Sequence, residues 1–133
     1  MEFQSVYGVL GCDDDSLPAD SNFREFDRLT RGAATAMRTP LEDPDKWKGW
    51  FEAAGFEAVV EKFFKIPSNP WAKNPRLRLI GAFELENFLV GLDGMSLRLF
   101  QKGLGWSAEE TSLFCSSVRK DIMNQRYHAY YPL

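Results

Sequence analysis

Glu84 combines a side chain suited to proton transfer with a position inside a predicted apolar helix face. It follows Ile80 by four residues and precedes Phe88 by four, a spacing that places all three on one side of a helix. Two interpretations stay open: a paired carboxyl at the edge of that face, or a buried general acid or base with a raised pKa. Asn87, three residues further on, would share the cavity and bind a carbonyl group.

His128 is the single histidine of the chain, and it lies among tyrosines. Such a residue is either a hydrogen-bonded core or edge residue, or the proton carrier of a pocket. Tyr7, Tyr130 and Tyr131 have hydroxyls that would stabilise a substrate oxygen by donating hydrogen bonds. The predicted catalytic residues are therefore Glu84, His128 and Tyr130.

Aromatic residues make up 14% of the chain, which is a large share for so small a protein. Most of Trp47, Trp50, Phe51, Phe63, Phe64 and Trp71 are expected in the core, and the remainder would line an apolar ligand pocket. We predict an apolar substrate held by Tyr7, Trp50, Phe64, Trp71, Asn87 and Tyr131.

Cys12 and Cys115 are the two cysteines, too few for a disulfide framework or for a Cys/His zinc site. We predict reduced thiols, and a Cys115–His128 nucleophile pair stays an alternative that requires contact between them. The acidic run at residues 13–15 is predicted to be a solvated loop rather than a cation site. No metal is expected.

The chain has 133 residues, is 44% apolar and carries a net charge of −3. This length predicts one domain, residues 1–133, with a core of its own. No apolar run reaches the roughly 18 residues of a membrane helix, and no secretion signal is predicted. The acidic balance argues against a nucleic-acid surface. We expect a cytoplasmic protein with neither a membrane nor a nucleic-acid partner.

Alternating residues predict strands over 1–10 and 56–66, and the beginning of another over 128–133. A helix is expected from Asp20 or Ser21 to Pro40, in which Asp27, Arg28 and Arg31 face solvent. A short helix follows Asp43–Pro44 and ends at Gly55.

Three further helices are predicted in the second half of the chain. Asn74–Pro75 begins the first, which Gly94 breaks, and residues 96–102 form the second. A capping box at Ser107–Glu110 opens the third, which runs to about Asn124. The order β-α-α-β-α-α-α-β predicts an α+β fold, with a few-stranded sheet packed by about five helices.

Several of these segments resemble the C-terminal half of the large fungal family of S-adenosylmethionine-dependent methyltransferases. That family includes secondary-metabolism methyltransferases and a methyltransferase-like global regulator of secondary metabolism. The resemblance covers nearly the whole chain. Its most specific parts are EAAGF at residues 52–56, Ile66-Pro67 followed by Pro70-Trp71, and LGWS at residues 104–107.

The resemblance implies a truncated class I methyltransferase-like fold that keeps the lid and substrate-pocket half. The family holds its cofactor on a glycine-rich loop between a strand and a helix, whereas Gly8 with Gly11 and Gly103 with Gly105 are isolated pairs. We therefore expect no cofactor on this chain. The missing strands would leave exposed edges, so we expect a homodimer, with a compact monomer as the alternative.

Some members of the resembling family work as cyclases or pericyclases without methylation. The resemblance therefore suggests a cofactor-independent cyclase or isomerase of fungal secondary metabolism, acting on an apolar polyketide- or terpenoid-type metabolite. Such a pocket would hold the substrate folded and assist by acid–base chemistry. The alternatives are a non-catalytic accessory or regulatory partner of a methyltransferase, and a C-terminal piece of a methyltransferase.

Overall fold

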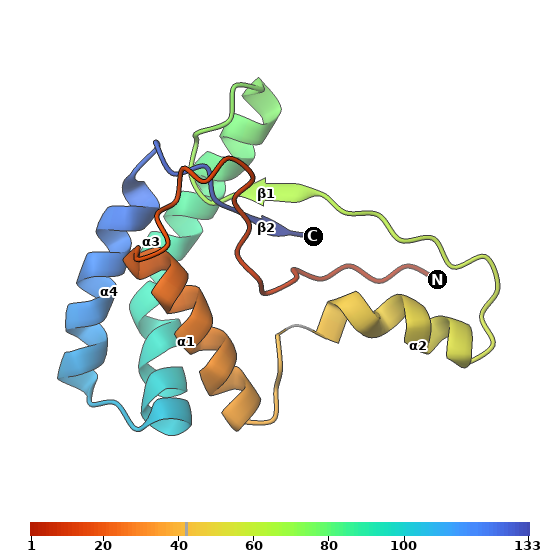
Figure 1. Ribbon diagram of the computed structural model, residues 1–133, viewed down its shortest axis with the longest axis horizontal. Coiled ribbons are helices and arrows are strands. Elements are labelled where there is room, and N and C mark those ends of the chain that lie inside the picture. Colours follow the sequence, from red (N-terminus) through yellow and green to blue (C-terminus); the bar gives the residue numbers. More distant parts are fainter. Residues whose placement is uncertain (42) are drawn as a thin grey trace.

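The computed structural model describes residues 1–41 and 43–133. A helical body at one end contains α1 (Asn22–Ala36), α3 (Pro75–Leu104) and α4 (Ala108–Met123) (Figure 1). An arm at the other end contains α2 (Trp47–Ala53), residues 54–64 and the first part of residues 1–11, which we call the N-terminal segment. The elements in chain order are α1 (Asn22–Ala36), the 3-10 helix η1 (Asp43–Lys46), α2 (Trp47–Ala53), β1 (Lys65–Pro67), α3 (Pro75–Leu104), α4 (Ala108–Met123) and β2 (Tyr130–Pro132). The predicted α+β class is confirmed.

The helices begin where the sequence places capping residues. The Ser21 hydroxyl accepts a hydrogen bond from the backbone N–H of Arg24, and Asn74 caps α3 in the same way. Ser107 and Glu110 form a reciprocal capping box at the start of α4. These side chains satisfy N–H groups that have no partner within the helix, so three predicted helix starts are confirmed.

The predicted break at Gly94 is wrong, because α3 runs unbroken from Pro75 to Leu104. The described residues therefore form four α-helices, not five. A glycine inside a helix costs about 1 kcal/mol relative to alanine. Burial of Leu92, Ser96 and Phe100 on one face of α3 outweighs that cost, since each buried apolar side chain contributes about 1.5–3 kcal/mol.

The core lies between α1, α3 and α4. Phe23, Phe26, Phe100, Val118 and Ile122 are almost fully buried there, as the 3.6-residue spacing of the apolar positions predicts. The rings of Phe26 and Phe100 lie 5.9 Å apart, which joins α1 to α3. Among the described residues, no helix is long and apolar enough to span a lipid bilayer.

β1 and β2 form an antiparallel pair in which Ile66 lies opposite Tyr131. The N-terminal segment lies along the other edge of β2: the N–H of Tyr7 donates to the carbonyl of Pro132 at 2.8 Å, and Gly11 forms a bridge with Tyr130. The predicted strand over 1–10 is wrong as a regular strand, and of the predicted strand over 56–66 only Lys65 and Ile66 belong to β1. Both segments extend past Leu133, where no described residue pairs with their backbone.

Candidate functional site

Charged and polar side chains meet where the N-terminal segment ends beside β1 and β2. We call this group the polar cluster: Asp13, Asp14, Lys65, His128 and Tyr130. The N-terminal segment and β1 both pair antiparallel with β2, so they run parallel to each other. Asp13 and Asp14 come two and three residues after Gly11, which forms a bridge with Tyr130 of β2.

A hydrogen bond between the His128 ring and the Asp14 carboxylate forms the first half of the polar cluster. The imidazole Nδ1 lies 2.5 Å from the Asp14 Oδ2, and this contact lowers the pKa of Asp14 below its ordinary value. The backbone N–H of His128 donates to the Ser16 hydroxyl at 2.8 Å. The ring packs against Trp71 with centroids 4.9 Å apart. A carboxylate on Nδ1 fixes the orientation of an imidazole, which suits proton transfer at its other nitrogen.

The second half of the polar cluster consists of Tyr130, Asp13 and Lys65. The Tyr130 hydroxyl donates to Asp13 Oδ1 at 2.6 Å, while the Lys65 ammonium pairs with the same carboxylate and lies 4.7 Å from the Tyr130 ring centroid. The contact with Lys65 and the hydroxyl of Tyr130 lower the pKa of Asp13. The bond to Asp13 raises the pKa of Tyr130, so the hydroxyl stays a donor.

The interpretation of residues 13–15 as a solvated loop is incomplete. All three aspartates are exposed, yet Asp13 and Asp14 bind partners that lie 117 and 114 positions away in sequence. Local sequence carries no signal for contacts of that range. Lys65, which starts β1, was likewise not identifiable as part of a site.

Asp27 is buried, which contradicts the prediction that it faces solvent. Its side chain accepts hydrogen bonds from the Leu10 N–H at 3.1 Å and from the Tyr131 hydroxyl at 3.4 Å, and it pairs with Arg31 at 3.0 Å. Burial raises the pKa of Asp27. Burial also raises the pKa of Tyr131 well above its ordinary value. Because Tyr131 stacks on Phe88 with centroids 6.0 Å apart, it lies in the core.

Glu84 lies on α3 and is half-buried, next to the exposed Asn87. Burial raises the pKa of Glu84, and a hydrogen bond from Asn87 opposes the shift. The charge of Glu84 helps to raise the pKa of Tyr131, so the Glu84 carboxyl lies near the buried Tyr131 side chain. Neither of the two hollows described below is lined by Glu84, His128 or Tyr130.

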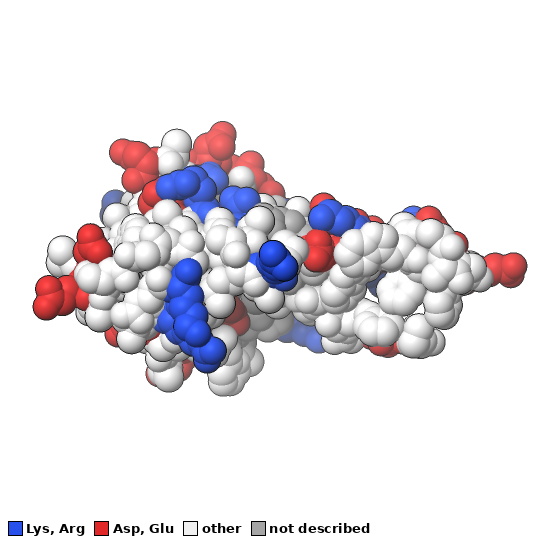
Figure 2. Space-filling view, turned by 90° about the horizontal axis from the view of Figure 1, so that it is seen from below, with Lys and Arg blue, Asp and Glu red and all other residues white. Residues whose placement is uncertain are grey.

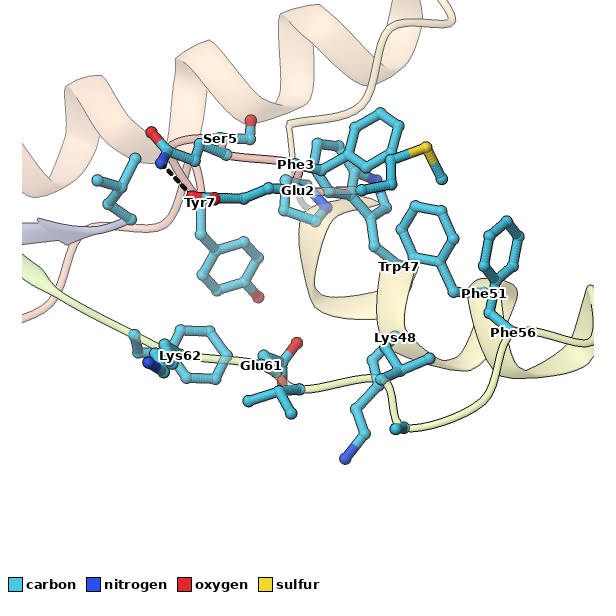
Figure 3. Close-up of a pocket in the computed structure, with 18 of the residues that line it drawn as sticks. Glu2, Phe3, Ser5, Tyr7, Trp47, Lys48, Phe51, Phe56, Glu61 and Lys62 are labelled. Atoms are coloured by element: carbon cyan, nitrogen blue, oxygen red, sulfur yellow. Dashed lines mark hydrogen bonds between the residues drawn. The ribbon is translucent and has the colours of Figure 1, made fainter.

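An apolar groove of about 780 Å³ opens on the arm (Figure 3). The N-terminal segment, α2 and residues 56–64 form its walls, and Tyr7 and Phe64 are among its lining residues. Trp50 lies in an adjoining hollow of about 430 Å³ with Phe3 and Phe51. Thus three predicted substrate-binding residues line neighbouring hollows, whereas Trp71 lies at the polar cluster.

Much of the aromatic surplus lies outside the core. Trp50, Phe63 and Phe64 remain 55%, 63% and 60% exposed, and Trp47, Phe51 and Trp71 are only partly buried, so the expectation that most of these six aromatic residues pack in the core is wrong. The arm has a hollowed, largely uncharged face, while charged residues lie along the upper margin of the view and on the helical body (Figure 2). The aromatic residues of the arm are exposed because α2 packs on Phe3 of the N-terminal segment and not on the helical body.

The connection between β1 and α3 does not fit the glycine-rich cradle of S-adenosylmethionine. The segment between β1 and α3, residues 68–74, contains no glycine, whereas close approach of the backbone to the cofactor depends on glycine. Within the described ranges, no group of His, Cys, Asp and Glu residues is placed to hold a metal ion. Cys12 and Cys115 are both free thiols. Cys115 is fully buried in α4, whereas His128 is partly exposed in the polar cluster.

Comparison with known proteins identifies relatives along nearly the whole chain. The chain is 33% identical over 130 residues to the methyltransferase pytC of Aspergillus terreus, covering 97% of this chain and 40% of pytC. It is 28% identical over 133 residues to the probable methyltransferase tdiE of Emericella nidulans, covering 42% of that protein. The secondary metabolism regulator laeA of Fusarium oxysporum is 30% identical over 130 residues. No family model and no solved structure matches.

The α+β fold with its short sheet fits a methyltransferase-like protein. The chain is a homologue of fungal methyltransferases and secondary-metabolism regulators, and it corresponds to their C-terminal part. It spans about 40% of the length of the curated relatives it matches. The resemblance found in the sequence is confirmed.

Proposed function

We propose that the chain is the C-terminal, substrate-facing part of a methyltransferase-like protein of fungal secondary metabolism. The observation that carries this proposal is the match to methyltransferases and regulators over 97–100% of the chain but only 40–42% of the relatives. This partial coverage supports the interpretation that the chain contributes to a larger fold more directly than the interpretation that it is an independent catalyst.

The contribution assigned to this chain is the binding of a polar group of the substrate. The polar cluster gathers ionisable and hydroxyl side chains from three separate segments at the surface. Its ionised Asp14 holds the His128 ring, and its Tyr130 hydroxyl is a fixed donor. These groups supply an oriented imidazole and an oriented hydroxyl for a substrate with exchangeable protons.

Cofactor-independent cyclisation or isomerisation of an apolar metabolite remains a prediction. It requires Glu84, His128 and Tyr130 to act on one substrate, and Glu84 lies in the environment of Tyr131 instead. Conversion of pathway intermediates by the chain alone, without S-adenosylmethionine, would support that function over the one proposed.

The test joins this chain to the part of pytC that precedes the matched segment. We expect the chimera to bind S-adenosylmethionine in the micromolar range, about −8 kcal/mol, whereas the chain alone gives no binding heat in isothermal titration calorimetry. The variant Asp14→Asn in the chimera should bind the cofactor as well as the parent does, because the polar cluster is assigned to substrate.

A chimera that is folded by circular dichroism and does not bind S-adenosylmethionine, under conditions in which intact pytC does, would contradict the proposal. Loss of cofactor binding in Asp14→Asn with retained folding would contradict the assignment of the polar cluster to substrate. The two outcomes test separate parts of the proposed function.

A further inference from the structure

Asp13 is bound within the polar cluster as a carboxylate ligand would be. The Tyr130 hydroxyl donates to Asp13 Oδ1 at 2.6 Å, and the Lys65 ammonium pairs with Asp13 Oδ2. We call Lys65 and Tyr130 the donor pair. Each oxygen of the carboxylate therefore has a donor of its own, and charge-assisted hydrogen bonds of this kind are the strong ones by which proteins recognise carboxylates.

The donor pair is held in place by contacts that do not involve Asp13. The backbone groups of Tyr130 and Gly11 exchange two hydrogen bonds, at 2.8 Å and 2.9 Å. A Cβ at position 11 would lie 2.6 Å from the Tyr130 ring, so glycine leaves the room that the ring occupies. Lys65 pairs with Pro132 in the β1–β2 ladder, and its ammonium lies 4.7 Å from the Tyr130 ring centroid. Both donors are thus positioned before a ligand arrives.

Asp13, in contrast, can leave the donor pair without disturbing the fold. Its side chain is 61% exposed, and that of Lys65 is 53% exposed. The backbone on either side of it is attached separately, through Gly11 to β2 and through Asp14 to His128. A rotation of the Asp13 side chain therefore uncovers both donors, and an exposed ion pair opposes such a rotation only weakly.

We propose that the donor pair binds the carboxylate of a small organic acid, and that Asp13 covers this site until the acid displaces it. The inference rests on the proposed function, because it names the substrate group that the polar cluster binds. The Asp13 side chain is then an autoinhibitory contact, since an incoming acid gains the two donors only by releasing a carboxylate that already holds them. The exchange also frees the Tyr130 hydroxyl, which otherwise donates to Asp13, for the substrate.

The charges around the donor pair favour a ligand with a single negative charge. Lys65 supplies one positive charge, and the bond to Asp13 raises the pKa of Tyr130, which therefore stays neutral. The hydrogen bond from Lys65 lowers the pKa of Asp13, whereas the negative charge of Asp14 opposes that shift. A phosphate dianion would meet the repulsion from Asp14 with twice the charge. A carboxylate presents the same charge and the same two oxygens as Asp13.

The test titrates the full chain and its Asp13→Ala variant with sodium acetate, sodium benzoate and inorganic phosphate at constant ionic strength. The ring signals of Tyr130 and the Cε signal of Lys65 are followed by nuclear magnetic resonance. We expect acetate and benzoate to bind Asp13→Ala with dissociation constants in the millimolar range. The parent should bind them about tenfold or more weakly, because the donor pair is uncovered in only a small fraction of its molecules.

Asp15→Ala is the matched control, because Asp15 is exposed in the same loop and its replacement should leave acetate binding as weak as in the parent. A second change, Lys65→Met, is placed in the Asp13→Ala chain, where it keeps the length of the side chain but removes its charge. This double variant should lose acetate binding by about tenfold or more. Circular dichroism checks that every variant is folded.

The acidity of Tyr130 gives a readout that a purely structural contact would not change. Because the hydrogen bond to Asp13 raises the pKa of Tyr130 in the parent, Asp13→Ala should lower that pKa. Saturating acetate should raise it again, since the bound carboxylate replaces that of Asp13 on the hydroxyl. The pH dependence of the Tyr130 ring signal measures both changes.

Equal acetate affinity in the parent and in folded Asp13→Ala overturns the autoinhibitory contact. Undetectable binding to Asp13→Ala, or binding that persists after Lys65→Met, overturns the site. Phosphate that binds Asp13→Ala as tightly as acetate overturns the assignment to a carboxylate. A blocked glutamate peptide that binds more tightly than benzoate overturns the assignment to a small acid in favour of an acidic protein segment. These measurements use the chain alone, whereas cofactor binding to the chimera tests the proposed function, so failure of one is distinguishable from failure of the other.

Discussion

The Nδ1 atom of His128 lies 2.5 Å from the Oδ2 atom of Asp14, although 114 positions separate the two residues. A second contact from the His128 N–H to the Ser16 hydroxyl reinforces the link. Together these two contacts hold the loop around Asp14 and Ser16 against His128, which lies just before β2. The polar cluster therefore depends on an ionised Asp14.

Replacing Asp14 by asparagine should reduce the sensitivity of folding to acid. The pKa of Asp14 in the folded chain lies below its ordinary 3.8, so its contribution to stability is present above about pH 4 and is lost as the pH falls further. We expect Asp14→Asn to melt at a lower temperature than the parent at pH 7 and to lose less further stability on acidification. Thermal melts followed by circular dichroism between pH 7 and pH 2 measure both effects.

Asp15→Asn is the matched control for that experiment, since Asp15 is exposed in the same loop and makes no hydrogen bond within the described ranges. Its melts should follow the parent at every pH. Parallel curves for the parent and Asp14→Asn would show that the contact with His128 contributes nothing to folding.

Asp27→Ala should destabilise the chain by about 2–4 kcal/mol, because it leaves the Leu10 N–H and the Tyr131 hydroxyl buried without their acceptor. The neighbouring Arg28→Ala is the control. Arg28 pairs with Glu25 at an exposed site, and its loss should cost about 0.5 kcal/mol or less. Urea titration compares the two free energies of unfolding. Similar values would refute the structural role of the buried carboxylate.

Gly81 and Gly94 lie in the same helix and should respond to alanine with opposite signs. A Cβ at position 81 would lie 2.2 Å from the carbonyl oxygen of Asn69, whereas a Cβ at position 94 meets nothing within 4 Å. We expect Gly81→Ala to cost about 1–3 kcal/mol through overpacking. Gly94→Ala should gain about 0.5–1 kcal/mol through helix propensity. Destabilisation by Gly94→Ala in urea titration would indicate that α3 is not continuous there.

Asn69→Ala should cost about 1–3 kcal/mol. The Asn69 amide donates to the carbonyl oxygens of Ile122, Asn124 and Tyr127 at 3.0, 3.2 and 3.4 Å, which closes the end of α4 onto the loop after β1. The exposed Asn87→Ala is the control and should change the free energy of unfolding by about 0.5 kcal/mol or less. Equal urea midpoints for the two variants would contradict this function of Asn69.

Local sequence signals were sufficient for the starts of the helices but not for the sheet. Ser21, Asn74 and Ser107 mark helix starts because each cap acts on N–H groups two or three residues away. The alternation in residues 1–10 predicted a strand, but a strand also needs a partner, and pairing with β2 ends at Tyr7. Gly94 wrongly predicted a helix break, because the burial of apolar side chains on another face of α3 outweighs the low helix propensity of glycine.

The candidate site was only partly predictable. His128 and Tyr130 were identified as residues with useful chemistry, and both lie in the polar cluster. Asp13, Asp14 and Lys65 could not be assigned to it, since their neighbours in sequence indicate only a charged loop and the edge of a strand. Asp27 was predicted to face solvent, yet its buried side chain accepts hydrogen bonds from Leu10 and Tyr131.

The sequence by itself determined the class of fold, the starts of the helices, the apolar face of α1 and the resemblance to fungal methyltransferases. Each of these depends on short-range spacing or on residue identity, which a linear chain displays directly. Only the tertiary structure decided which carboxyl groups are buried, which are held by His128 and Lys65, and where backbone edges stay unpaired. Those properties arise from contacts between segments distant in sequence, whose energies are set by burial and geometry.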